Sequence, residues 1–161
     1  MVTVLQPRPL VEVRDLKRNL RIDPDVEDFD ADLDVKLQAA IASAESFIGR
    51  DLGRVPVISY PYARVTALHL DPALRIVTVK IGGGEISPEG WSYAGGNLSL
   101  YDENHDAEDV VTVETAYRPD IGVAVLMHAS SMWMNPADSV ETLPKASKNL
   151  LTQYRTYAGG N

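Results

Sequence analysis

The feature that most constrains the fold is a stripe of apolar residues spaced as on one face of a long helix. Intervals of four, four, three and four residues separate its members, Leu33, Leu37, Ile41, Ala44 and Ile48. This spacing is that of an amphipathic α-helix. Acidic residues precede the stripe and Arg50 follows it. Negative charge near the start of a helix and positive charge near its end both stabilise the helix through its dipole. We therefore predict a helix over residues 28–52, ended by Gly53.

A second apolar segment lies far along the chain. Residues 121–134 are almost wholly apolar, which predicts a helix over 120–135 that is buried on several sides. Pro119 suits the first position of that helix. Shorter patterns predict helices over 12–20 and 145–154. Because neither long helix can leave its apolar face in water, we expect the two to pack together.

The residues between the two long helices have a different character. They contain β-branched and aromatic runs separated by turn residues, without a helical period, and we predict a β-rich insertion over 55–118. Glycines at 82–84 and 95–96 predict hairpin connections. The predicted strands span 64–70, 74–81, 98–101 and 110–117.

These elements predict an α+β fold, in which a small helical bundle carries the β insertion. A chain of 161 residues fits a single domain, 1–161. We expect residues 1–10 to form an extended amino-terminal arm, because Pro7 and Pro9 favour extended geometry in the residues before them. Residues 155–161 are expected to form a carboxy-terminal tail.

The composition excludes several classes of function. The chain has no cysteine, so it has no disulfide framework and no thiolate chemistry. Its net charge of −8 and the absence of a basic run argue against a protein built to hold nucleic acid. The amino terminus lacks the apolar core of a signal peptide, and no segment is long enough to span a bilayer. We expect a soluble protein without membrane contact.

The polar residues do not assemble into a pattern typical of catalysis. The acidic segment 23–34 matches a calcium loop only in part, since such a loop needs glycine where this chain has Asp28. The histidines His69, His105 and His128 share no metal-ligand spacing. We predict no metal, no cofactor and no enzymatic activity. A small hydrolase that depends on His128 or His105 is the alternative.

Four residues are candidates for contact with a protein partner. Tyr154, Arg155 and Tyr157 cluster near the carboxy terminus, and Trp133 lies among methionines in the second long helix. Tyrosine, arginine and tryptophan are typical anchors of protein interfaces. The alternatives are a core position for Trp133 and an unstructured end for the other three.

The β insertion offers a different binding hypothesis. Trp91, Tyr93 and Tyr101 could stack against a carbohydrate or a peptide, because aromatic rings present large apolar faces. This would make the chain a binding module.

The order of the helical motifs resembles that of a known family. Its residues are EVRDLKRNLRIDPDVEDFDADLDVKLQAAIASAESFIGRDLG near the start, then PDIGVAVLMHASSMWMN and LPKASKNLLTQYRTY. Together they resemble the bacteriophage head–tail connector family, also called head-completion adaptors, which has relatives in gene transfer agents. The resemblance covers about Val11–Gly53 and Pro119–Tyr157, and the insertion between them matches loosely.

This resemblance implies a structural subunit of the virion or phage-like particle. Such proteins form a homo-oligomeric ring, expected to be a dodecamer, between the portal protein and the next tail-side connector or stopper protein. The ring extends the DNA channel, and DNA passes through it without specific binding. The resemblance also implies synthesis in the bacterial cytoplasm and assembly at the head–tail junction. Another structural protein that completes the tail is the alternative within the same particle.

Overall fold

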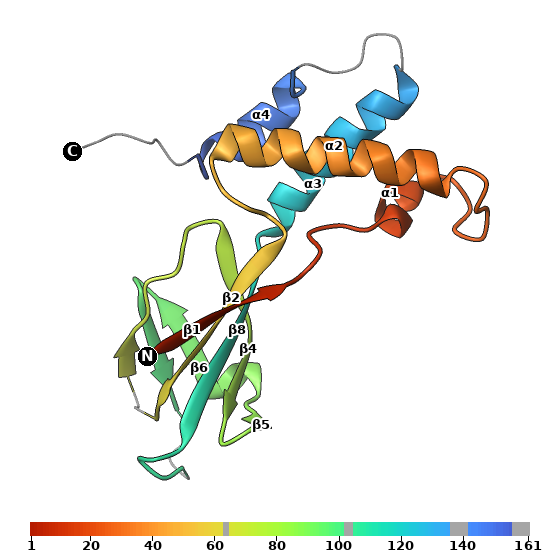
Figure 1. The fold of residues 1–161 in the computed structure, drawn as a ribbon. Coiled ribbons are helices and arrows are strands. Elements are labelled where there is room, and N and C mark those ends of the chain that lie inside the picture. Colours follow the sequence, from red (N-terminus) through yellow and green to blue (C-terminus); the bar gives the residue numbers. More distant parts are fainter. Residues whose placement is uncertain (63–64, 102–104, 136–141, 156–161) are drawn as a thin grey trace. The chain divides into compact units, whose positions relative to one another are not determined.

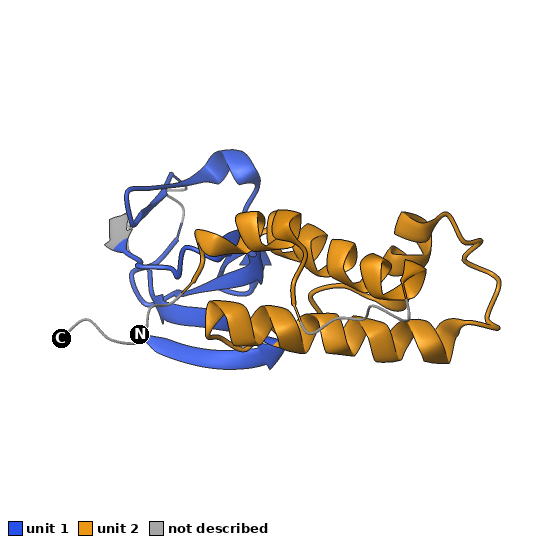
Figure 2. Ribbon diagram, turned by 90° about the horizontal axis from the view of Figure 1, so that it is seen from above, with its two compact units in different colours: residues 1–8, 54–117 blue, residues 9–53, 118–161 orange. Residues whose placement is uncertain are grey.

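The computed structural model describes residues 1–62, 65–101, 105–135 and 142–155, drawn in colour in Figure 1. It has the predicted α+β composition and divides into two compact units, which Figure 2 colours separately. Residues Met1–Arg8 and Arg54–Tyr117 form the β unit. Residues Pro9–Gly53 and Arg118–Asn161 belong to the helical unit.

The helical unit is built from the two segments that flank residues Arg54–Tyr117 in the sequence. Its helices are α1 (Val13–Leu20), α2 (Asp30–Ile48), α3 (Pro119–Met134) and α4 (Lys145–Thr152). Helix α3 packs against each of the other three, and its contact with α2 is the most extensive. The predicted packing of the two long helices is confirmed. Four members of the predicted stripe are buried, and Ile41 is half-buried.

Helix α2 is shorter than predicted at both ends. The prediction that Gly53 ends it is wrong, because Gly49 takes the left-handed conformation, with φ 76°, and its amide donates to the carbonyl of Glu45. The chain then turns, and the Glu45 carboxylate accepts the amide of Leu52 at 2.8 Å. A glycine that accepts positive φ at no steric cost therefore stops the helix one turn before the next glycine.

The β unit contains two antiparallel sheets. One has the strand order β1-β2-β8-β4-β5 and the other has the order β3-β7-β6. The buried side chains of both sheets form a single apolar cluster. The elements are β1 (Val2–Pro7), β2 (Arg54–Pro61), β3 (Val65–Ala67), β4 (Leu74–Ile81), β5 (Gly84–Glu85), the 3₁₀ turn η1 (Pro88–Gly90), β6 (Trp91–Ala94), β7 (Asn97–Leu100) and β8 (Val110–Tyr117).

Strands β4 and β8 match their predictions, whereas β1, β2, β5 and β6 were missed. The predicted strand over 64–70 is reduced to the short β3, and β2 precedes it. Prolines at both 56 and 61 concealed β2, since proline is depleted in strands. Pro56 is accommodated because it lies just before the ladder between β2 and β8, which begins at Val57; its carbonyl accepts the hydroxyl of Thr115 at 2.7 Å. Strand β1 lies within the segment predicted as an arm, and β6 follows directly on η1.

A buried lysine fixes how α1 is joined to α2. The side chain of Lys17 is 4% exposed, and its ammonium group bonds the carbonyl of Pro24 at 3.1 Å and the carboxylate of Asp30 at 2.5 Å. Asp30 opens α2, and Pro24 lies in the connection between the helices. One cation therefore holds the connection and the start of α2 against α1. A buried charge is tolerated because it is both paired and hydrogen-bonded.

Replacing Lys17 tests this role. We expect Lys17→Met to lower the free energy of unfolding by about 1–3 kcal/mol, because a carbonyl and a carboxylate lose their partner. Urea denaturation followed by circular dichroism measures the change. Arg18→Met is the matched control on the same helix; since that side chain is 74% exposed, its change should stay within about 0.5 kcal/mol. Equal midpoints for the wild type and Lys17→Met would contradict the assignment.

Candidate partner interface

Tyr154 lies inside the helical unit, where it ties together three segments. It follows α4 and is 7% exposed. Its hydroxyl donates to Oδ2 of Asp120 at 2.7 Å, and its carbonyl accepts Nη2 of Arg50 at 2.9 Å. Burial, together with the bond to Asp120, raises the pKa of Tyr154 to about 12. The ring is therefore held within its own subunit, and its contact with a partner stays a prediction.

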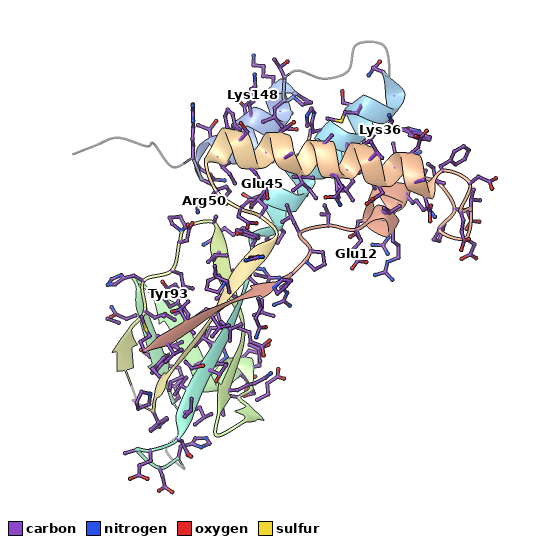
Figure 3. The ribbon with its side chains drawn as sticks, viewed as in Figure 1. Glu12, Lys36, Glu45, Arg50, Tyr93 and Lys148 are labelled. Atoms are coloured by element: carbon purple, nitrogen blue, oxygen red, sulfur yellow. The ribbon has the colours of Figure 1, made fainter. Side chains whose placement is uncertain are left out.

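Arg155 lies beside Tyr154 at the surface of the same corner. Its guanidinium group is placed over the ring of Phe47, 5.2 Å from the ring centre, a cation–π arrangement. Two residues earlier, the side chain of Gln153 donates to Oδ2 of Asp120 at 3.0 Å. Figure 3 shows this end of α2 with Arg50 and Glu45 labelled. Tyr157, the third predicted anchor, lies outside the described residues.

Trp133 belongs to the opposite end of the α2–α3 pair, which runs antiparallel (Figure 1). It is half-buried and meets Phe29 edge to face, with ring centres 5.5 Å apart and an angle of 72° between the rings. Phe29 caps the start of α2, so the pair closes the end of the bundle. The structure therefore brings Tyr154 and Arg155 together but leaves Trp133 at a different end.

An apolar ridge on α3 was not singled out from the sequence. Val123, Met127 and Met134 are exposed and follow one another at helical intervals, so they lie on one face. We call these three residues the α3 ridge. The prediction of a helix buried on several sides holds for the rest of α3, where eight residues are buried. The all-apolar composition hid the ridge, because it gave no contrast between the buried and exposed faces.

A basic stripe on α1 was also missed. Arg14 and Arg18 are exposed one turn apart on the outer face of α1, and Arg21 is the exposed left-handed residue that ends the helix; we call these three the arginine stripe. They border an open groove of about 490 Å³ that Ile22, Asp23 and Pro24 complete. The sequence signal for the stripe is the spacing of the three arginines, which do not form a continuous basic run.

The histidines of the hydrolase alternative belong to different units. His128 belongs to the helical unit and is buried, and neither of its ring nitrogens has a hydrogen-bond partner among the described residues. His105 belongs to the β unit, where its Nδ1 lies 3.4 Å from a carboxylate oxygen of Asp109 and its ring packs against Tyr62. Burial lowers the pKa of His128, so it is neutral near pH 7.

Two of the three aromatic residues of the stacking hypothesis pack against the apolar core of the β unit. Trp91 and Tyr93 are half-buried against the apolar cluster. The hydroxyl of Tyr93 donates to the carbonyl of Leu68 at 2.8 Å and accepts the amide of Leu70 at 3.3 Å. Tyr101 is exposed, and its hydroxyl shares a hydrogen bond of 2.6 Å with that of Ser92. The two rings proposed to stack beside Tyr101 are thus packed into their own fold.

The described part of the chain shows neither a metal site nor a membrane-spanning helix. There, no three histidine or carboxylate side chains converge so as to hold a metal ion. Asp23, the first residue of the candidate calcium loop, instead accepts the amide of Asp25 at 3.0 Å, a local turn contact. None of the described helices combines the length and apolar character needed to cross a membrane.

The lowered pKa of His128 predicts that stability depends on pH. On unfolding, the imidazole regains its ordinary pKa of 6.5. Below that pH the unfolded chain binds a proton that the folded chain resists, so the free energy of unfolding should fall as the pH drops from about 7 to about 5. The free energy of unfolding of the His128→Leu variant should fall less over this pH range. Urea denaturation at the two pH values measures both, and equal losses would contradict the prediction.

Comparison with known proteins gives structural likenesses. No family model and no curated protein matches the chain. A chain from the neck of an empty GTA particle, computed with C6 symmetry, is 16% identical with a TM-score of 0.46, and 97% of each chain is covered. A chain from the virion of a native gene transfer agent particle is 17% identical, with a TM-score of 0.45 and 96% of each covered. A chain from the neck of a native GTA particle, computed with C12 symmetry, is 16% identical, with a TM-score of 0.41 and 97% of each covered.

Proposed function

We propose that this protein is a structural subunit of the head–tail junction of a tailed phage or phage-like particle, acting by assembly and without catalysis. The observation that carries the proposal is where the family-like motifs lie. The segments Val11–Gly53 and Pro119–Tyr157, which resemble head–tail connectors, are far apart in sequence. Their described residues belong to one compact unit, built on the packing of α2 against α3. The β-rich residues between them form a unit of their own.

The exposed surfaces of the chain suit a subunit that meets several neighbours. The α3 ridge presents valine and methionine side chains to solvent. Exposed apolar groups of this kind, when they gather on one face, mark protein interfaces. A ring requires a heterologous interface, in which two different surfaces of one subunit meet successive neighbours. The α3 ridge is a candidate for one such surface.

Strand β1 offers a second contact surface. It lies at the edge of its sheet, pairs with β2 alone, and all six of its residues are exposed, including Val2, Val4 and Leu5. An edge strand presents unpaired backbone groups that can bind another chain. We propose that this amino-terminal strand meets another component of the particle.

The charge of the chain fits a passage for DNA. Twelve copies would carry 12 × (−8) = −96 charges. An acidic channel wall repels phosphate, so DNA would pass without being held. At physiological ionic strength such a field is screened beyond about 8 Å, so the carboxylates that face the channel would produce the effect.

The partners of such a ring would be the portal protein on one side and a tail-side connector or stopper protein on the other. We propose that the carboxy-terminal residues Arg155 and Tyr157 contribute to docking, and that Trp133 contributes at the opposite end of the bundle. Tyr154 would act by holding this corner in place, because its hydroxyl is bonded to Asp120.

Ring formation is the direct test of the proposed function. We expect negative-stain microscopy of the protein mixed with its portal protein to show rings stacked on the portal, and light scattering to show a mass well above that of one chain. Wild-type protein that never exceeds the mass of a monomer, with the portal present, would overturn the proposal.

The role of the carboxy terminus is tested by a shortened chain that ends at Arg155. This variant keeps the buried Tyr154 and the Arg155–Phe47 contact, so we expect its thermal unfolding to match the wild type. Its docking to the portal should weaken about tenfold or more, the loss expected when an interface anchor worth more than about 1.4 kcal/mol is removed. Tyr157→Ala in the full chain separates the effect of this side chain from that of length. Full docking by both variants would contradict the assignment.

A further inference from the structure

The arginine stripe is an unusual feature on a chain of net charge −8. Three of its fifteen basic residues are exposed and border one groove: Arg14 and Arg18 on α1, and Arg21 at the residue that ends the helix. Within α1, Nη1 of Arg18 lies 3.5 Å from a carboxylate oxygen of Asp15. An exposed pair of this kind contributes about 0–1 kcal/mol and leaves the guanidinium group able to bind another anion. The groove beside the stripe shows that this face is concave.

A surface of opposite sign follows directly along the chain. It consists of exposed carboxylates in the α1–α2 connection and the first turns of α2, which we call the acidic segment: Asp25, Glu27, Asp28, Asp32 and Asp34. The planar guanidinium group matches a carboxylate with two parallel hydrogen bonds, so arginines in a row suit such a segment.

Both surfaces are held in one frame by Lys17. It lies between two stripe residues in the sequence but points inward, where it bonds the connection at Pro24 and the start of α2 at Asp30. The outward arginines and the acidic segment are thereby fixed relative to each other. Two fixed and complementary surfaces on one subunit are what a heterologous interface requires, because the same contact then repeats with the same rotation.

We infer that the arginine stripe of one copy binds the acidic segment of the next copy in the ring. This inference rests on the proposed function and names the contact between its subunits. Double-stranded DNA is the other polyanion that could meet arginines. It is disfavoured because tight binding to a duplex needs many lysine or arginine contacts with phosphates, and this chain has a net charge of −8 and no basic run.

Charge reversal in two places tests the contact. We expect Arg14→Glu combined with Arg18→Glu to weaken self-association about tenfold or more, as does Asp28→Lys combined with Asp32→Lys. Mixing the two variants should restore assembly, because in an alternating ring each interface regains one basic and one acidic surface. Sedimentation velocity with the portal present measures the assembly, and circular dichroism confirms that each variant is folded. Arg14→Gln combined with Arg18→Gln is the milder control and should lie between.

Cross-linking locates the contact directly, since the chain has no cysteine of its own. A short bismaleimide should join an Arg18→Cys copy to an Asp28→Cys copy in the mixed sample, far more than it joins either variant to itself. Ser46→Cys, an exposed position on α2, replaces Asp28→Cys in the control mixture and should give little product.

The outcomes separate the inference from the proposed function. If the wild type forms rings but the mixture does not recover and the cross-link is absent, the inference is overturned and the proposed function stands. If the wild type forms no oligomer with the portal, both are overturned. If duplex DNA binds the wild type and loses its binding with Arg14→Glu and Arg18→Glu while rings persist, the stripe is a nucleic-acid surface and the inference is overturned.

Discussion

The packing of α2 against α3 is the contact on which the helical unit depends. The two helices come from segments separated by residues Arg54–Tyr117 of the β unit, so the chain must return close to where it left. The β unit makes this possible by ending its path beside its beginning: β2 and β8 are antiparallel neighbours, and the hydroxyl of Tyr117 donates to the carbonyl of Arg54 at 2.9 Å. The entry and exit strands are thus held together, which lowers the entropy cost of joining distant helices.

The helices could be predicted because their apolar residues recur at a helical period. The β unit was harder, because strand propensity depends on what a strand packs against. Strand β2 contains two prolines and was missed, yet it lies inside its sheet, between β1 and β8. The carbonyl of Pro56 accepts the hydroxyl of Thr115. Helix ends were also misplaced, since two nearby glycines can each end a helix and only the backbone path decides between them.

The candidate interface shows a different limit of sequence reasoning. Tyr154 and Trp133 were chosen because their residue types are common at interfaces, but the same types are common in cores. Whether such a residue is buried in its own subunit depends on partners far away in sequence. Asp120 accepts the hydroxyl of Tyr154, and Phe29 contacts the ring of Trp133. Neither pairing leaves a local signal. The α3 ridge and the arginine stripe have local patterns, but the ridge is hidden within a uniformly apolar helix.

The distribution of charge matters more here than its sum. A net charge of −8 makes copies of this chain repel one another at long range, and screening confines that repulsion to about 8 Å. Within that distance, the arrangement of individual groups decides whether two subunits attract. The ammonium group of Lys17 is buried in the helical unit, where it bonds Pro24 and Asp30. The guanidinium groups of Arg14 and Arg18 lie at the surface. An acidic protein can therefore repel DNA over most of its surface and still present a local basic site to an acidic neighbour.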